Sequence, residues 1–512
     1  MKIDHSMSQN IKAAFAIIAV CGTLLLQCVG QERSPATTNA GAPDELKAPL
    51  VIPQPKTLRL GVGQFRVPSG AKWILHAAAR DERLWLAAQL AFAGKPSSFE
   101  QTHQPWIVLA FGASSRTNFP AGQPQPRWAS DPEGYRLTAD TNGVVILAAT
   151  MQGAFYGLQT LAQLWQESPS GRSCPVLEIE DWPAMRFRGV HWFPSASGVP
   201  MHQRLITNVF GALKFNRSVI QCEAARWDKH PEITALNAIS KPDLRKLVET
   251  CRQCYLEPIP LLNVPGHAEW IFRNGSNLDF AEDPKTPYAY CVNNPKSFEF
   301  MQDVLHECLP IFESKVCHIG HDEVTMLGRF PNPECPLCKG ATTTALVVKH
   351  ANHLSEWLSQ QGVESMIWGD MLLGPGEATD ATHAKTLEDA RQRRAGIDKK
   401  TIIVDWHYAA AADARSIKLL RAEGFRVVAA SFYAPENIFT LSQAPQAAGA
   451  EGFLQTTWMG YFPDERAMRS ELQQFTAFVL AAEYAWSGRK ESPAQLGYDP
   501  QEVFRKAYAR TR

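Results

Sequence analysis

The sequence predicts an α/β protein in which a (β/α)8 (TIM) barrel follows a small α+β domain. Three observations support this prediction. Between residues 187 and 457, eight short apolar runs alternate with helical segments, which is the pattern of consecutive βα units. Nearly every run ends in polar or aromatic residues, as expected where barrel strands open into a site. Upstream, strands and helices are mixed without that alternation, which favours an α+β domain.

The chain begins with a pattern typical of exported proteins. Lys2 and Lys12 precede an apolar run at 13–26, and Gly30 offers a plausible cleavage position. We therefore expect a signal peptide at residues 1–30 and an exported protein, whether periplasmic, outer-membrane-associated or secreted.

The residues after the signal favour a flexible connection. Residues 31–48 are rich in Ala, Pro, Thr and Gly and are expected to form a linker. The apolar run before them is short for a membrane span. A lipid anchor on Cys28 ranks second to cleavage, because Gln27 is a poor residue before a lipidated cysteine.

Residues 49–180 are expected to form the α+β domain, 181–490 the barrel, and 491–512 a C-terminal helix. In the first domain we expect strands at 73–75, 106–109, 133–137 and 143–147 and helices at 80–93 and 152–166. In the barrel we expect strands at 187–192, 217–223, 257–263, 315–320, 365–369, 401–406, 426–431 and 452–457. Helical periodicity between them is clear at 241–254, 295–312 and 343–361.

The charge balance argues against a nucleic-acid partner. Lys plus Arg and Asp plus Glu both number 51, so the net charge is zero, and no basic tract is present. The sequence gives no indication of oligomeric state.

The most informative stretch is 315–324, where an apolar run passes through glycine into Asp322 and Glu323. It predicts a buried parallel strand whose carboxyl end opens into a site. Adjacent like charges push at least one pKa upward, and a general acid at neutral pH needs a raised carboxyl pKa. Two carboxylates at such an end are therefore candidates for acid–base chemistry.

Other strand ends supply the candidate surroundings of these carboxylates. Aromatic faces suit sugar rings, and the sequence holds 14 Trp residues. The candidates are His191, Trp192, Glu223, Asn263, His267, Trp368, Asp370, Trp406, His407, Tyr433 and Trp458.

These motifs together resemble glycoside hydrolase family 20, the β-N-acetylhexosaminidases. The run His-Ile-Gly-His-Asp-Glu-Val at 318–324 is similar to the family's catalytic strand, and Pro-Gly-His-Ala at 265–268 to its third-strand loop. Residues 51–55, 133–135 and 153–161 resemble its N-terminal domain. The resemblance implies a hydrolase that removes terminal β-linked N-acetylhexosamine from a glycan, without a cofactor.

The resemblance also implies residue roles. Glu323 would be the general acid/base, Asp322 would orient the substrate's 2-acetamido group, and His267 would support Glu323. Tyr433 would hydrogen-bond the acetamido group. The remaining expected substrate contacts are Trp368, Trp406 and Trp458, which would form the walls of the sugar pocket, with Glu223 and His191.

Several outer contacts depart from the family pattern. After the first strand, residues 191–196 lack the arginine that holds the terminal sugar's hydroxyls. Glu223 replaces the first residue of an Asp-Asp pair and is a candidate partner for His267, while Asn263 and Gly460 replace an acidic residue each. The reaction is therefore expected to persist, and the specific sugar is left open.

The two adjacent carboxylates also bear on mechanism. Successive strand residues point to opposite faces, so Asp322 and Glu323 cannot flank one bond from a regular strand. A substrate whose own acetamido oxygen is the nucleophile removes this difficulty through an oxazolinium intermediate. Alternatives are a catalytically lapsed or altered-specificity glycan-binding protein and, more weakly, a metal hydrolase using His318 and His321 with Asp322.

Eleven cysteines are present, nine of them after the predicted signal. Cys335 and Cys338 have zinc-ribbon spacing, but no second such pair accompanies them. A local disulfide, half of a metal site and unpaired thiols all remain open, with a structural role favoured. We assign no metal ligand to the predicted active site.

Overall fold

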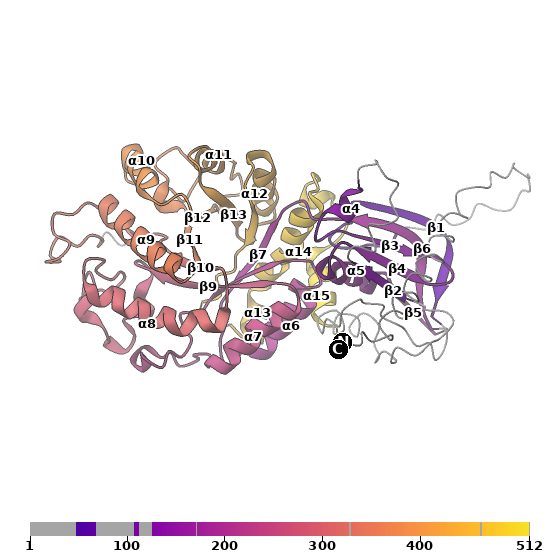
Figure 1. Cartoon of the computed structure of the whole chain (residues 1–512), viewed down its shortest axis with the longest axis horizontal. Coiled ribbons are helices and arrows are strands. Elements are labelled where there is room, and N and C mark those ends of the chain that lie inside the picture. Colours follow the sequence, from indigo (N-terminus) through magenta and orange to yellow (C-terminus); the bar gives the residue numbers. More distant parts are fainter. Residues whose placement is uncertain are drawn as a thin grey trace, which may run out of the picture.

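The computed structural model describes residues 48–67, 107–111, 125–169, 171–326, 329–460 and 463–510. These residues form two parts, a barrel and a sheet, with α14 (Leu472–Ser487) and α15 (Pro500–Tyr508) at their junction (Figure 1). The expected signal peptide, nearly all of the expected linker, the strand at 73–75 and the helix at 80–93 lie outside the described residues.

The barrel confirms the predicted (β/α)8 fold. Its eight parallel strands close in the order β10-β11-β12-β13-β14-β7-β8-β9. Each expected strand is present within two residues of its predicted bounds. The strands are β7 (Phe187–Trp192), β8 (Arg217–Gln221), β9 (Glu257–Val264), β10 (Val316–Gly320), β11 (Glu364–Trp368), β12 (Ile402–Trp406), β13 (Arg426–Ser431) and β14 (Gly452–Gln455).

Helices surround these strands, and most of them bury apolar side chains against the barrel. Side-chain caps fix several starts: Ser240, Asn294 and Thr342 accept a backbone N–H of the first turn that follows each of them. The helices are α6 (Val199–Leu205) with a π-helical turn (Ile206–Phe210), α7 (Lys241–Gln253), α8 (Pro295–Phe312), α9 (Thr343–Gln360), α10 (Leu387–Gly396), α11 (Arg415–Ala422), α12 (Pro435–Ala448) and α13 (Glu465–Ser470).

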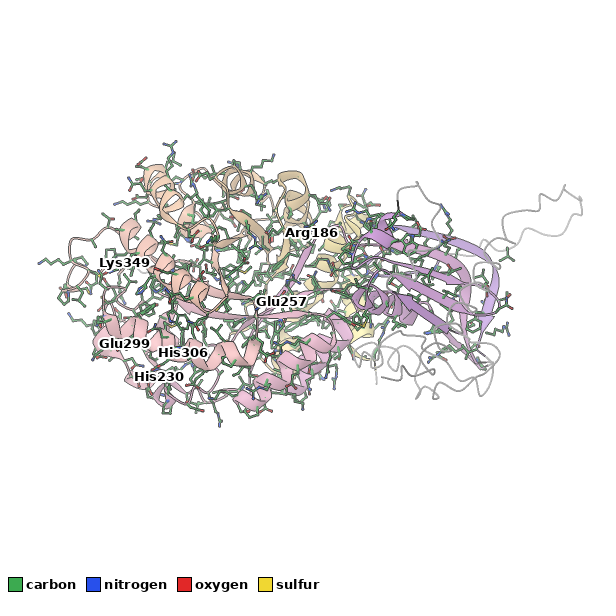
Figure 2. All side chains as sticks on the ribbon, viewed as in Figure 1. Arg186, His230, Glu257, Glu299, His306 and Lys349 are labelled. Atoms are coloured by element: carbon green, nitrogen blue, oxygen red, sulfur yellow. The ribbon has the colours of Figure 1, made fainter. Side chains whose placement is uncertain are left out.

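The outer helix faces are polar. Glu299 and His306 on α8 and Lys349 on α9 are exposed on the outside of the barrel (Figure 2). In α8 and α9 this division into an apolar inner and a polar outer face is the amphipathic pattern that the sequence periodicity predicted.

The first domain is a six-stranded sheet with α5 (Met151–Leu164) packed against it. The order is β1-β6-β3-β4-β2, with β5 beside β6, and the pairs are antiparallel except for β2 with β4. The strands are β1 (Thr57–Arg66), β2 (Ile107–Phe111), β3 (Tyr135–Ala139), β4 (Val144–Ala148), β5 (Gln166–Ser168) and β6 (Gly171–Asp181), with a short α4 (Arg127–Ser130) before β3.

The C-terminal helix is shorter than predicted. The sequence suggested a helix at 491–512, but α15 covers only Pro500–Tyr508, because the prolines at 493 and 500 permit a helix to start but not to continue through them. Among the described residues, no helix is both long enough and apolar enough to cross a membrane.

Asp181, the last residue of β6, joins the sheet to the barrel. Its buried Oδ2 accepts hydrogen bonds from Tyr135 Oη (2.7 Å), Lys214 Nζ (2.9 Å) and Trp486 Nε1 (2.9 Å). Tyr135 belongs to the sheet, whereas Lys214 and Trp486 belong to the barrel part of the chain. The Asp181 and Lys214 side chains are both 0% exposed, so each charge depends on the other.

We expect Asp181→Ala to lower the free energy of unfolding by about 3–5 kcal/mol, because it leaves the Lys214 ammonium buried without its counter-charge. Urea unfolding followed by circular dichroism measures the change. Glu178→Ala on the same strand is the control; it breaks a partly exposed ion pair with Arg136 and should cost at most about 1 kcal/mol. Equal losses in the two variants would contradict this role for Asp181.

Candidate active site

The chain leaves β10 through a left-handed turn. Gly320 has a φ of 71°, His321 of 74° and Glu323 of 48°. At Gly320 a side chain is also sterically excluded, because a Cβ atom would lie 2.5 Å from Asn263 Oδ1. The turn breaks the alternation of a regular strand, so the side chains of Asp322 and Glu323 are free to face the same site.

The turn brings both carboxylates to His267, whereas the family resemblance implied only that His267 supports Glu323. His267 Nε2 lies 3.2 Å from Glu323 Oε2 and 3.6 Å from Asp322 Oδ2. Asp322 is buried, with its Oδ1 lacking a hydrogen-bond partner among the described residues, while Glu323 and His267 are half-buried. The site therefore holds an acid–base pair beside a buried carboxylate oxygen that is available to a ligand.

The protons of this cluster are distributed unequally. Burial raises the pKa of Asp322 to about 7, with the Asp370 and Glu323 charges adding to the rise against His267. Burial lowers the pKa of His267, but its hydrogen bond to Glu323 and nearby carboxylate charges raise it on balance to about 9. The hydrogen bond from His267 lowers the pKa of Glu323. The raised carboxyl pKa expected of a general acid thus falls on Asp322, because Glu323 has the imidazolium beside it.

Asp370, in the loop after β11, fixes the position of Glu323. Its Oδ2 accepts the backbone N–H of Glu323 and Nδ1–H of His383, both at 2.8 Å, and its Oδ1 accepts the indole N–H of Trp406 at 3.0 Å. One carboxylate therefore connects the turn after β10 to an aromatic side chain of β12 and to a second histidine.

A buried chain of hydrogen bonds supports the turn from behind. His321 Nδ1 donates to Ile319 O at 2.9 Å, which leaves Nε2 to accept from His350 Nδ1 at 2.8 Å, and His350 Nε2 contacts the hydroxyl of Tyr290. Burial lowers the pKa of His321 to about 4, so the imidazole is neutral. With both His321 nitrogens engaged, the geometry offers no support for the metal-hydrolase alternative.

The three predicted tryptophans are placed differently. Trp406 and Trp458 are half-buried at strand ends, and Trp458 Nε1 donates to Tyr408 Oη at 2.8 Å. Trp368 is only 1% exposed and packs on His318 with ring centroids 4.4 Å apart, so its ring is largely inside the barrel. Tyr433, by contrast, is 41% exposed and contacts the ring of Phe432.

His191 and Glu223 lie behind the site, within the barrel. His191 Nε2 is 3.0 Å from Gln221 Oε1, and Gln221 Nε2 donates to Glu223 Oε1 at 3.0 Å. Glu223 also accepts the backbone N–H of Asn263 at 2.7 Å. It thus anchors the end of β9 from which the His267 loop departs, whereas the sequence suggested direct support of His267.

Sequence reasoning missed three residues that face the carboxylates. Tyr288 donates from its hydroxyl to Glu323 O at 2.9 Å, and its ring lies edge-on to His267. The charges of Asp322 and Glu323 act on Tyr408, whose pKa burial raises. His383 has a pKa raised first by its hydrogen bond to Asp370. All three lie in loops, where no motif or regular spacing marks them in the sequence. Only Tyr408 could have been found, because it follows the predicted strand-end residues Trp406 and His407.

Comparison with known proteins identifies the family and supports the fold. The model of "Glycosyl hydrolase family 20, domain 2" matches residues 48–182, and that of "Glycosyl hydrolase family 20, catalytic domain" matches residues 218–488. A chitobiase from Flavobacterium johnsoniae has the same fold, with a TM-score of 0.71 at 17% identity over 90% of this chain and 72% of that one.

Two curated relatives match more locally. A beta-hexosaminidase of Porphyromonas gingivalis is 27% identical over 37% of this chain, and a lacto-N-biosidase of Bifidobacterium bifidum is 21% identical over 66%. The matched parts are 29% and 30% of those two proteins, so this chain spans less than a third of their length.

We expect Asp322→Asn to stabilise the protein at pH 8 by about 2–4 kcal/mol, because each pH unit between the two pKa values of a group is worth about 1.4 kcal/mol. Between pH 3.8, the usual aspartate pKa, and about pH 7, Asp322 keeps its proton in the folded protein but loses it in the unfolded chain. Wild-type stability therefore falls as pH rises through that window. The asparagine has no proton to lose, and the gain should vanish near pH 4.

Urea unfolding of both proteins from pH 4 to 8 measures this difference. Asp398→Asn, an exposed residue at the other end of the barrel, is the control and should leave the pH dependence unchanged. A gain from Asp322→Asn that is constant with pH would show that ionisation of Asp322 is not its cause.

Proposed function

The chain belongs to glycosyl hydrolase family 20, and from that premise we propose that it removes terminal β-linked N-acetylhexosamine from glycans by a retaining, substrate-assisted mechanism. The observation that carries the proposal is the placement of Asp322 and Glu323 on one turn, both within reach of His267. The similarity to proteins named beta-hexosaminidase supports the same activity.

The carboxylates favour a nucleophile supplied by the substrate. A retaining enzyme with its own nucleophile needs a second carboxylate about 5–5.5 Å from the acid, on the other side of the scissile bond. Asp370 is the further carboxylate whose charge acts on Asp322, but its oxygens are engaged by Glu323, His383 and Trp406. A 2-acetamido oxygen, already tethered beside the anomeric carbon, takes the place of that carboxylate.

The chemical steps then follow from the residues. Glu323 donates a proton to the glycosidic oxygen, the bond from that oxygen to the anomeric carbon breaks, and the acetamido oxygen bonds to the same carbon. Asp322 accepts the amide N–H through its unpartnered Oδ1 and, when ionised, stabilises the positive oxazolinium. Glu323 then removes a proton from the water that opens the oxazolinium, which restores both the protein and the β-configuration.

His267 supplies the proton that the free Glu323 does not hold. With a pKa of about 9, the imidazole is protonated at neutral pH and hydrogen-bonded to Glu323. A bound glycan excludes water from the half-buried His267 and Glu323. Loss of water favours the neutral imidazole and the neutral carboxylic acid over the two charged forms, so the proton of His267 moves to Glu323.

We also propose that the protein acts outside the cytoplasm. Lys2, Lys12 and the apolar run at 13–26 support export, with cleavage after Gly30 and a lipid anchor at Cys28 as the second choice. An N-acetylated glycan outside the cytoplasm is the substrate partner that suits both this location and the site.

We expect Glu323→Gln to lower kcat by roughly 10²–10⁴-fold on substrates with poor leaving groups, the usual contribution of general acid catalysis. The loss should shrink for nitrophenyl glycosides, whose leaving group needs little protonation. Steady-state kinetics on a matched pair of glycosides measures both effects. Near wild-type turnover on the poor leaving group would remove Glu323 from the acid role.

We expect catalysis to depend on the 2-acetamido group. The glucoside that matches an aryl N-acetylglucosaminide should turn over roughly 10³-fold more slowly or worse, because it lacks the tethered nucleophile. A thiazoline analogue of the oxazoline should inhibit strongly, and Asp322→Asn should lose most activity while remaining folded.

Comparable kcat/KM on the two substrates, or a covalent glycosyl adduct on an Asp or Glu, would contradict this mechanism. Tight binding of the thiazoline without turnover of any N-acetylglycoside would instead favour the catalytically lapsed, glycan-binding alternative.

A further inference from the structure

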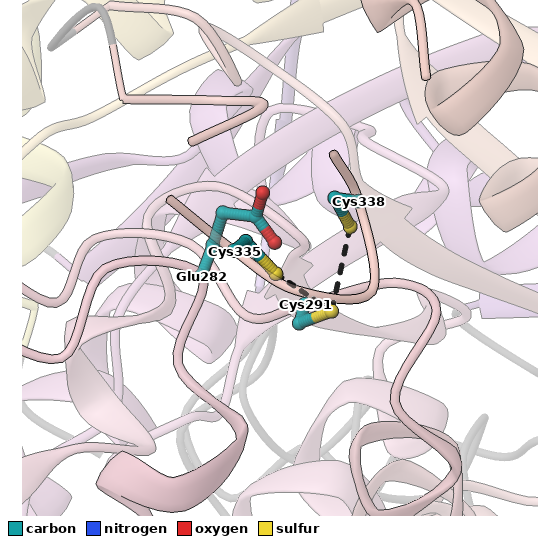
Figure 3. A group of neighbouring side chains, drawn as sticks. All are labelled: Glu282, Cys291, Cys335 and Cys338. Carbon is teal, nitrogen blue, oxygen red and sulfur yellow. Dashed lines mark hydrogen bonds between the residues drawn. The ribbon is translucent and has the colours of Figure 1, made fainter. Parts of the chain in front are cut away.

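Three thiols and a carboxylate converge between the loops that follow β9 and β10 (Figure 3). Cys335 and Cys338 come from the loop between β10 and α9, and Glu282 and Cys291 from the loop between β9 and α8. One ligand atom from each residue lies within 4.8 Å of the others, and all four residues are buried. The sequence showed only the Cys335–Cys338 half, because Cys291 and Glu282 lie 44 and 53 positions before Cys335, without a recognisable spacing.

The sulfur positions match tetrahedral metal coordination. Cys291 Sγ is 3.4 Å from Cys338 Sγ and 3.6 Å from Cys335 Sγ. Sulfurs around a zinc ion with Zn–S bonds of about 2.3 Å lie roughly 3.8 Å apart, whereas a disulfide needs about 2.05 Å. Since Cys291 is almost equally distant from the other two, a disulfide with either would leave the third thiol buried beside the carboxylate.

Glu282 gives the second, independent indication of a cation. Its Oε1 accepts the backbone N–H of Asn332 at 2.8 Å, but its Oε2 is buried and has no hydrogen-bond partner among the described residues. The residue is 1% exposed. A buried carboxylate oxygen without a partner is costly, and a metal ion at the centre of the four ligand atoms satisfies it.

Neighbouring groups orient the sulfurs. The side-chain amide of Asn293 donates to Leu337 O at 2.9 Å and contacts Cys338 Sγ at 3.6 Å. Such outer contacts orient ligands and stabilise thiolates in known metal sites.

We propose that Glu282, Cys291, Cys335 and Cys338 bind one structural Zn²⁺ ion. Thiolate-rich sets select zinc over magnesium or calcium, which require oxygen ligands. Four protein ligands fill a tetrahedral shell and leave no position for substrate, so the ion stabilises structure and takes no part in the reaction.

The ion would join the two loops that carry the catalytic groups. The loop that supplies Glu282 and Cys291 also supplies His267 and Tyr288. Tyr288 lies three residues before Cys291 in the chain, and its hydroxyl donates a hydrogen bond to Glu323 O. The loop that supplies Cys335 and Cys338 begins with Asp322 and Glu323. Zinc at this place therefore helps to hold His267 against Glu323 from outside the sugar pocket.

Metal content tests the proposal independently of activity. The full chain, purified without chelator, should contain one zinc per protein by plasma mass spectrometry. X-ray absorption at the zinc edge should give about three sulfurs near 2.3 Å and one oxygen near 2.0–2.2 Å. Cys291→Ser should lose at least nine-tenths of the zinc, whereas Cys174→Ser, a buried thiol in the first domain, should retain it.

Three results would overturn the assignment. The first is that the protein purified without chelator contains no zinc and its non-reduced peptides show a disulfide among Cys291, Cys335 and Cys338. The others are a different metal in the site and full zinc retention by Cys291→Ser. If that variant does not fold, the absorption spectrum of the wild type alone decides the ligand set. Inactive protein with one zinc of this ligand set would contradict only the proposed reaction.

Discussion

The left-handed turn from Gly320 to Glu323 is the constraint on which the site depends. Positive φ angles at non-glycine residues carry an energetic cost, so the turn persists only if its surroundings hold it. β9 holds one side, where Val264 O accepts the N–H of His321 at 2.9 Å. Asp370 holds the N–H of Glu323 and Tyr288 holds its carbonyl, from opposite neighbours in the barrel. Both carboxylates therefore sit on backbone that is fixed from several strands at once.

That arrangement concentrates negative charge and then balances it in part. Asp322, Glu323 and Asp370 face two imidazoles, His267 and His383, whose pKa values are both raised. Of the three carboxylates, Asp322 has the least compensation, because its buried Oδ1 has no hydrogen-bond partner among the described residues. Burial is the first cause of the raised pKa of Asp322, and the charges of Asp370 and Glu323 add to the rise. A positively charged intermediate beside Asp322 would complete the balance, which is the charge that an oxazolinium carries.

The sequence predicted the barrel and the core of the site because both are recorded locally. The alternation of apolar runs with helical segments identified all eight barrel strands. The adjacent Asp322 and Glu323 indicated the position of the site. The sequence placed Asp370 at a strand end but could not show that it links Glu323, Trp406 and His383. Such links depend on where long loops fold back, and nothing in their spacing records it. The same limit applies to Glu223: the sequence offered it as a candidate partner for His267, and the structure shows its hydrogen bond to the backbone of Asn263.

The site therefore also depends on how the loops that carry His267 and Glu323 are held in position. Barrel strands position Gly320 and Val264, but His267 and Glu323 lie beyond them, in loops with few regular elements. Links between those loops include the His267–Glu323 hydrogen bond, the Tyr288–Glu323 hydrogen bond and the cluster of Cys291, Cys335, Cys338 and Glu282. In the proposed mechanism the first would change as the proton moves between His267 and Glu323, whereas the second acts on the backbone of Glu323. In the proposed mechanism the cluster takes no part in proton transfer, so it would keep the loops together while the protons of His267 and Glu323 move.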